Sequence, residues 1–330
     1  RVGSIGPGPC RRPAVRRLDV ATFARLIFPT IRNQGPATVL EHNPEPSNPL
    51  QMDGIEFIEY ATSQPQALAN VLQMMGFVAI ARHRSREVTL FRQGTMNVIV
   101  NAHPEALSGM AAPTARPQLS AIAVRVRDAE AAFHRALGLG AWAMPTRASV
   151  MELNIPGIHG VGGSLIYFVD RYKDFSIYDV DFIALPGVDR NPPALAGMHW
   201  FGIVQSVYED RSGDWSDFYR ELLGFAPLPG GQYFGILPKG TLLASPGNKF
   251  YLQLIEPPSG SEDIDWDEQL LRVGIGVPDV EKAMQALKAR GVVFVDRDPV
   301  QPSAKGALTQ IYFGSVTFEL VKSDLPAATR

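Results

Sequence analysis

The chain repeats one pattern, in which a run of alternating apolar and polar residues precedes an amphipathic segment with helical spacing. Two segments show the pattern in parallel: 121-AIAVRVRDAEAAFHRALGLGA-141 and 272-RVGIGVPDVEKAMQALKARGV-292. The alternation predicts a strand, and the spacing after it predicts a helix. Asp128 and Asp279 stand where a side chain can cap each helix. Gly138 and Gly291 stand where a left-handed C-terminal residue is expected.

A second pair of segments indicates that the chain is a duplication. Helices are predicted at 67-ALANVLQMMGF-77 and 215-WSDFYRELLGF-225, each ending on Gly-Phe and each following a strand-like run, 55-IEFIEYA-61 or 201-FGIVQSV-207. Gly76 and Gly224 are 148 residues apart, and Asp128 and Asp279 are 151 apart. Further short strands are predicted at 88–94, 97–101, 163–170, 250–256 and 308–321.

These elements predict an α+β fold made of duplicated βαβββ modules. Two such modules usually form one curved sheet, with helices outside and a concave side that can hold a ligand. We therefore predict an N-terminal cup at 52–185 and a C-terminal cup at 198–323, joined by the Pro- and Gly-rich linker 186–197. Residues 1–50, rich in Arg, Gly and Pro, are predicted to be a poorly ordered leader, and 324–330 a tail.

Composition narrows the class of partner. The chain has 330 residues, is 45% hydrophobic and 19% charged, and has a net charge of -2. It can bury a large core, and it lacks the strong charge that attracts nucleic acid or anionic lipid. Its single cysteine, Cys10, excludes an internal disulfide and fits a reducing compartment. We expect a cytoplasmic protein with a small-molecule ligand, without nucleic-acid or membrane partners; a homo-oligomer stays an open alternative.

Four stretches carry a resemblance to a known family: 54-GIEFIEYA-61, 75-MGFVAIARHRSREVTLFRQG-94, 151-MELNIPGIHGVGGSLIYFVDR-171 and 177-IYDVDFIALPGVDRNP-192. With the βαβββ duplication, they resemble the vicinal-oxygen-chelate superfamily, whose fold is glyoxalase/bleomycin-resistance-like, and within it the 4-hydroxyphenylpyruvate dioxygenases. The run GVGGSLIYFVD is also similar to the dioxygenase-like half of bacterial 3-dehydroshikimate dehydratases. The resemblance implies an oxidoreductase of aromatic amino acid catabolism whose C-terminal cup holds the catalytic site.

The resemblance also implies an Fe(II) site of two His and one carboxylate. Glu319, in 316-VTFELV-321, matches the carboxylate, but Gly202 and Arg272 stand at the positions of the two His. His199 precedes Gly202 by three residues, which places it on the opposite face of a strand unless a bulge shifts the register. We interpret His199 as a packing or surface residue, and as a substitute ligand only with such a bulge.

Arg272 and Glu319 are predicted to lie on neighbouring strands and to form an ion pair at the former metal position. A guanidinium offers a bidentate match to a carboxylate, whereas an unpaired buried carboxylate is costly. Gln310, in LTQIYF, matches the substrate-site glutamine of the resembled family. Arg272 and Gln310 are therefore the candidate substrate-binding residues, and Glu319 is the candidate catalytic residue.

Three functions remain open at this point. We favour a dioxygenase-like protein whose C-terminal cup binds a small aromatic or 2-oxo acid, with no metal cofactor. The first alternative is an active Fe(II)-dependent dioxygenase with substitute ligands for the missing His. The second is a metal-independent enzyme in which Glu319 is a general acid or base and Arg272 holds an anionic substrate.

Overall fold

The structure is a computed structural model. It describes residues 47–104, 116–145, 153–229, 235, 240–257, 266–297 and 300–324. Most of the predicted leader, residues 1–46, and most of the predicted tail, residues 325–330, lie outside this range. In the described part, no helix is long and apolar enough to cross a membrane.

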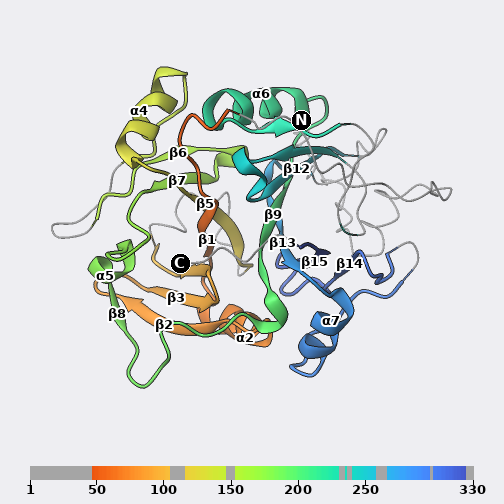
Figure 1. The fold of residues 1–330 in the computed structure, drawn as a ribbon. Helices are drawn as coiled ribbons and strands as arrows, with labels where there is room; N and C mark the ends of the chain where they lie inside the picture. Colours follow the sequence, from red (N-terminus) through yellow and green to blue (C-terminus); the bar gives the residue numbers. More distant parts are fainter. Residues whose placement is uncertain are drawn as a thin grey trace, which may run out of the picture.

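The chain forms four successive units, each starting with a strand and a helix (Figure 1). The first half contains β1 (Ile55–Ala61), α2 (Pro65–Met74), β2 (Val78–His83), β3 (Val88–Gln93), β4 (Met96–Asn101), β5 (Gln118–Arg125), α4 (Ala129–Gly138), β6 (Gly157–His159), η1 (Val161–Gly163), β7 (Leu165–Val169), α5 (Ile177–Asp181) and β8 (Phe182–Ala184). After η2 (Leu195–Gly197), the second half contains β9 (His199–Ser206), α6 (Ser212–Leu223), β10 (Ala226–Pro227), β11 (Thr241–Ala244), η3 (Pro246–Asn248), β12 (Tyr251–Ile255), β13 (Gln269–Val277), α7 (Val280–Lys288), β14 (Gly306–Leu308) and β15 (Phe318–Lys322).

The helix caps follow the sequence at three of four predicted positions. The carboxylate of Asp128 accepts a hydrogen bond from the backbone N–H of Ala131 at 2.9 Å, and Asp279 caps α7 in the same way. Gly291 has a φ of 93°, as predicted for the left-handed residue after α7. The prediction for Gly138 is wrong, because Gly138 is the last residue of α4 and the left-handed residue is Gly140, also with a φ of 93°.

The run 308–321, predicted as continuous strand, is broken by a tight turn. Phe313 and Gly314 both have positive φ angles, of 52° and 74°, and Tyr312 pairs with Val316 across the turn. The final strand, β15, therefore begins only at Phe318. The turn lets β15 return antiparallel to β14 and parallel to β13, which places it inside the second sheet.

The strands form two mixed sheets, one from each half. The first has the order β6-β7-β5-β1-β4-β3-β2-β8 and the second β10-β11-β12-β9-β13-β15-β14. In each sheet, the first strands of the two units pair antiparallel at the centre, as β1 with β5 and β9 with β13. This arrangement is the α+β fold of duplicated modules that the repeat predicts.

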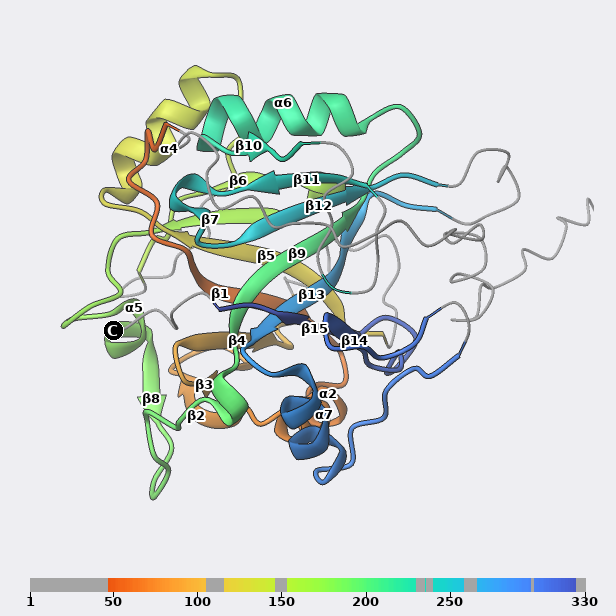
Figure 2. The same ribbon diagram turned by 45° about the vertical axis from the view of Figure 1, so that its right-hand side comes forward.

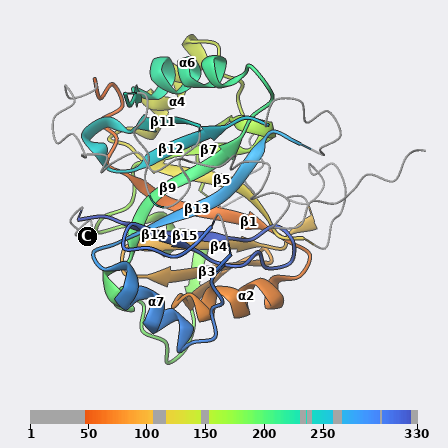
Figure 3. The ribbon, with the colours of Figure 1, turned by 90° about the vertical axis from the view of Figure 1, so that its right-hand side faces the viewer.

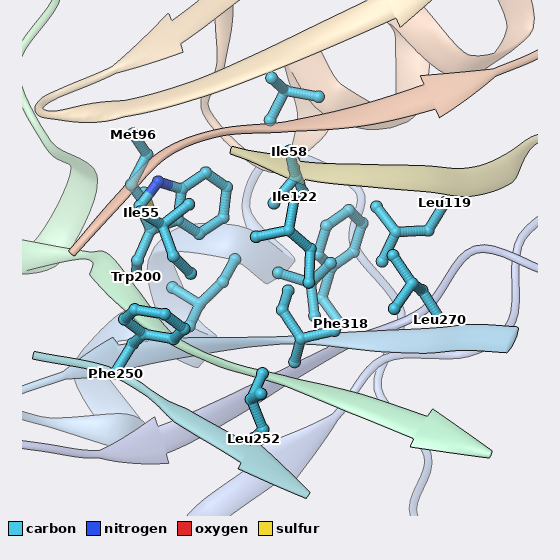
Figure 4. Packing of buried hydrophobic residues seen from close by; sticks show 14 of the residues in the cluster. Ile55, Ile58, Met96, Leu119, Ile122, Trp200, Phe250, Leu252, Leu270 and Phe318 are labelled. Atoms are coloured by element: carbon cyan, nitrogen blue, oxygen red, sulfur yellow. The ribbon is translucent and has the colours of Figure 1, made fainter. Parts of the chain in front are cut away.

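One apolar core joins the two sheets. Figure 4 shows Ile58 and Ile122 of the first sheet opposite Leu252, Leu270 and Phe318 of the second, and all five belong to one cluster of buried residues. We call the sheet faces that contribute to this cluster the inner faces. Side chains that alternate with them point away from the partner sheet, and we call those the outer faces.

The four longer helices of the described chain form two pairs, each with one member from each half. Figures 2 and 3 show α4 beside α6 at one end of the sheets and α2 beside α7 at the other. An arginine crosses between the halves at each end. Arg135 donates to the carbonyl of Glu221 at 3.2 Å, near the end of α6, and Arg290 donates to the carbonyls of Gln73 and Met74 at 2.8 and 3.2 Å. Cationic groups at helix C-termini satisfy free carbonyls and oppose the negative end of the helix dipole.

Replacing Arg290 with Met is therefore expected to lower the free energy of unfolding by about 1 kcal/mol, because two carbonyls at the end of α2 lose their donor. Urea denaturation measures the change. Arg297→Met is the matched control, since Arg297 is exposed and its side chain donates no hydrogen bond in the described part of the chain. The control is expected to stay within about 0.5 kcal/mol of wild type. Equal losses in both variants would contradict a capping role.

Candidate functional site

The candidate site lies on the outer face of the second sheet, where three central strands run side by side. Gly202 of β9 pairs with Gly274 of β13, which pairs with Glu319 of β15. These three residues form one row across the sheet. Two of the three lack a side chain, so Glu319 carries the only side chain in this row. The family resemblance puts Gly202 at the position of one of the two expected His. In the structure, Gly202 lies in the same row as Glu319.

Arg272 forms the predicted ion pair with Glu319. Its Nε atom lies 3.2 Å from Oε2 of Glu319, and both side chains are 5% exposed. Burial lowers the pKa of the Arg272 guanidinium, and the Glu319 carboxylate opposes this shift. The guanidinium remains a cation because its unperturbed pKa is so high. Glu319 is thus a buried carboxylate held beside a buried positive charge.

The guanidinium of Arg272 retains unused donors. The Nε–H group is not aligned for a hydrogen bond with the carboxylate, so the contact is an ion pair by proximity. The two terminal nitrogens donate no hydrogen bond to any residue that the structure describes. A guanidinium carries five N–H donors in a planar fork. Arg272 is consequently both neutralised and able to bind a further acceptor.

Backbone packs closely around two sides of the row. A Cβ atom on Gly202 would overlap the carbonyl oxygen of Tyr251, because β9 and β12 pair at this point. Gly235 lies directly against the carboxylate, and a Cβ atom there would overlap Oε1 of Glu319. A histidine at position 202 would therefore require the two strands to move apart.

A bulge brings His199 onto the outer face. Gly274 pairs with Gly202 and Ile275 with Trp200, so Phe201 is the extra residue in β9. His199 consequently points to the same side of the sheet as Glu319, and its ring lies over Gly276. The bulge that a ligand role for His199 requires is therefore present in β9.

The hydrogen bonds of His199 favour the packing role. Nδ1 lies 3.1 Å from the carbonyl oxygen of Gly197, and Nε2 lies 3.0 Å from the hydroxyl of Ser323. A carbonyl only accepts, so Nδ1 carries the proton and the lone pair on Nε2 accepts from Ser323. Burial lowers the pKa of His199 and so favours this neutral form. Both nitrogens are engaged within the protein.

Gln310 differs from the buried pair in its exposure. It follows β14, its backbone N–H donates to the carbonyl of Val293, and the residue is exposed. Arg272 and Glu319 are buried side chains of the central strands. The structure shows a contact between two of the three candidate site residues, and the substrate-binding role of Gln310 stays a prediction.

The described residues do not fit a three-ligand Fe(II) centre. Among the described residues, no group of three His, Cys, Asp or Glu is arranged to hold a metal ion. At the two expected His positions stand a cationic guanidinium and a glycine without space for a side chain. A guanidinium would also repel a divalent cation beside Glu319.

The sequence did not predict the aromatic pair of Phe201 and Tyr251 beside this site. The rings of Phe201 and Tyr251 lie 5.0 Å apart, and Phe201 lies next to the position of a Cβ atom on Gly274. The outward direction of Phe201 depends on the bulge, since simple alternation from Gly202 would turn it inward. The bulge itself has no clear signal in 199-HWFGIVQS-206.

Comparisons with known proteins agree with this fold. The family model described as "Hydroxyphenylpyruvate dioxygenase, HPPD, N-terminal" matches residues 46–183. A 4-hydroxyphenylpyruvate dioxygenase from Pseudomonas sp. (strain P.J. 874) is 35% identical over 264 residues, which cover 76% of this chain and 73% of that protein. A 3-dehydroshikimate dehydratase from Pseudomonas putida is 33% identical over 178 residues, covering 53% of this chain and 27% of that one.

Solved structures show the same fold at low sequence identity. A fusion protein of a xylose isomerase-like TIM barrel and a 4-hydroxyphenylpyruvate dioxygenase matches 90% of this chain and 53% of its own, with a TM-score of 0.66 and 22% identity. A mutant 4-hydroxymandelate synthase from Streptomyces coelicolor matches 87% of this chain and 95% of its own, with a TM-score of 0.61 and 15% identity.

The ion pair predicts non-additive effects on stability. Arg272→Met leaves Glu319 as an unpaired buried charge and is expected to lower the free energy of unfolding by about 3–5 kcal/mol. Adding Glu319→Gln should recover part of this loss, as measured by urea denaturation of the two single variants and the double variant.

The exposed pair Arg220–Asp217 on α6 is the matched control, with its charged atoms 2.7 Å apart. Its double-mutant cycle is expected to give a coupling below about 1 kcal/mol, because solvent screens the charges. Additive effects at Arg272 and Glu319 would show that the two side chains do not depend on each other.

Proposed function

Because the chain belongs to the 4-hydroxyphenylpyruvate dioxygenase family, we propose that its C-terminal cup binds a small aromatic or 2-oxo acid without the standard Fe(II) triad. The proposal rests on the burial and the contacts of the Arg272 guanidinium. Its guanidinium is buried and paired with Glu319, while its terminal nitrogens have no hydrogen-bond partner among the described residues. The carboxylate of a ligand is the group that matches such a donor fork.

The surroundings of Arg272 fit an aromatic acid. Phe201 and Tyr251 offer apolar ring surface on the same outer face, and Phe201 lies against Gly274, which pairs with Glu319. Aromatic side chains commonly line small-molecule sites in which a few polar groups set the orientation. In this arrangement Arg272 binds the acid group of the ligand, and the two rings contact its body.

Glu319 has a positioning role in the proposed site. Its carboxylate contacts the Nε side of the guanidinium, which directs the terminal nitrogens toward the ligand space. The pair is formally neutral before the ligand binds. Affinity therefore depends on hydrogen-bond geometry and ring contacts, because little net charge remains to attract an anion over a distance.

Calorimetric titration with 4-hydroxyphenylpyruvate tests the site. Saturable one-to-one binding is expected without added metal. The double variant Arg272→Met with Glu319→Gln, expected to fold better than Arg272→Met alone, should bind about ten- to a hundredfold more weakly because it lacks the charged donor. The alcohol 4-hydroxybenzyl alcohol is the ligand control and should bind weakly to both proteins. Unchanged affinity in the double variant would contradict the role of Arg272.

A metal titration separates this proposal from an active dioxygenase. Addition of Co(II) or anaerobic Fe(II) at micromolar concentration is expected to give no stoichiometric binding, as measured by metal analysis after gel filtration. One equivalent of bound metal that disappears in Glu319→Gln would favour the Fe(II)-dependent dioxygenase instead. Consumption of 4-hydroxyphenylpyruvate by the metal-free protein would favour the metal-independent enzyme.

A further inference from the structure

The first sheet carries a second polar site at the place that corresponds to the ion pair of the second sheet. The 151-residue spacing of the repeat relates Ala121 to Arg272. Ala121 of β5 pairs with Glu59 of β1. Two residues further along β5, Ala123 pairs with Tyr167 of β7, just as Gly274 pairs with Glu319. Glu59 and Tyr167 therefore face the outer side of the first sheet, where Tyr167 takes the place of Glu319 and Glu59 takes the place of Val204, the residue that pairs with Arg272.

Within the described residues, one oxygen of the Glu59 carboxylate is engaged and the other is not. Oε1 accepts from the side-chain amide of Asn101 at 3.1 Å and from the hydroxyl of Ser120 at 3.4 Å. Oε2 accepts no hydrogen bond from the residues that the structure describes, although Glu59 is 9% exposed. Both partners of Oε1 are neutral. Burial raises the pKa of Glu59, and the hydrogen bonds from Asn101 and Ser120 oppose that shift.

The hydroxyl of Tyr167 is a second polar group on this outer face, on the other side of β5 from Glu59. Its hydroxyl makes no hydrogen bond within the described residues. Burial raises the pKa of Tyr167, and the negative charge of Glu59 adds to the shift. The ring of Tyr167 also lies 5.9 Å from that of Phe57, so aromatic surface borders the two polar atoms.

Within the described residues, Glu59 has no cation in contact. Among the described residues, no Lys, Arg or His nitrogen lies within ion-pair distance of its carboxylate, and Arg86 acts on it only as a weaker, more distant charge. In the second sheet, Arg272 meets this need from the position that corresponds to Ala121. A buried carboxylate gains most from a hydrogen-bonded positive charge. An ammonium group also interacts favourably with the faces of neighbouring rings.

We propose that Glu59 and Tyr167 form a second ligand site, which binds the ammonium group of a small aromatic amine. The ammonium donates to Oε2 of Glu59 and to the hydroxyl oxygen of Tyr167, while the ring of the ligand packs near Phe57. This site lies on a different sheet from Arg272 and Glu319. It is therefore independent of the acid-binding site, and either can fail without the other.

Calorimetric titration of the full chain with tyramine tests the proposal. Wild type is expected to bind one equivalent with a dissociation constant below about 1 mM. Glu59→Gln keeps the shape of the side chain and should weaken binding at least about tenfold, because the charge-assisted hydrogen bond is lost. Glu130→Gln removes an exposed carboxylate of α4 and should leave the affinity unchanged. The probe p-cresol, which has the ring without the ammonium, should not give saturable binding.

The pH dependence supplies an independent readout. Protons compete with the ammonium for the Glu59 carboxylate, so the affinity for tyramine should fall as the pH is lowered through the raised pKa of Glu59. Tyr167→Phe should retain this dependence at a lower affinity, and it also serves if Glu59→Gln does not fold. Absence of saturable tyramine binding, equal binding by Glu59→Gln, or binding of p-cresol as tight as that of tyramine would each overturn the proposal.

Discussion

The apolar contact between the two sheets determines where charged strand residues can lie. Both inner faces contribute to one apolar core. A charged side chain on a central strand must therefore point outward. The outer faces are largely buried as well, and each charge there needs a partner. In the first sheet Glu56 pairs with Arg125 at 2.5 Å, and in the second Arg272 pairs with Glu319. Glu59 of the first sheet has no such cation among the described residues and is held by hydrogen bonds from Asn101 and Ser120.

These two ion pairs do not correspond to each other in the repeat. The spacing that relates Asp128 to Asp279 relates Arg125 to Gly276, and the ring of His199 lies over that glycine. The two halves therefore share a backbone arrangement but differ in how they neutralise buried charge. A site in one half gives no direct information on the side chains at the corresponding place in the other.

Local signals in the sequence were sufficient for most strands and helices, and the family motifs were sufficient for the ion pair. The Asp residues that begin α4 and α7 cap their helices, and Arg272 contacts Glu319 from the neighbouring strand, as predicted. Local irregularities of the strands could not be predicted. The bulge at Phe201 and the turn at Phe313 are examples, because each depends on the register of a partner strand. The outward directions of His199 and Phe201 follow from the bulge in β9.

The contact between Gly202 and the carbonyl of Tyr251 limits which residues position 202 can carry. The neighbouring strand occupies the volume that a side chain there would need, and it does so with its backbone, which cannot rotate away as a side chain can. Any redesign of this row that adds a side chain at position 202 therefore has to reposition β12 together with β9.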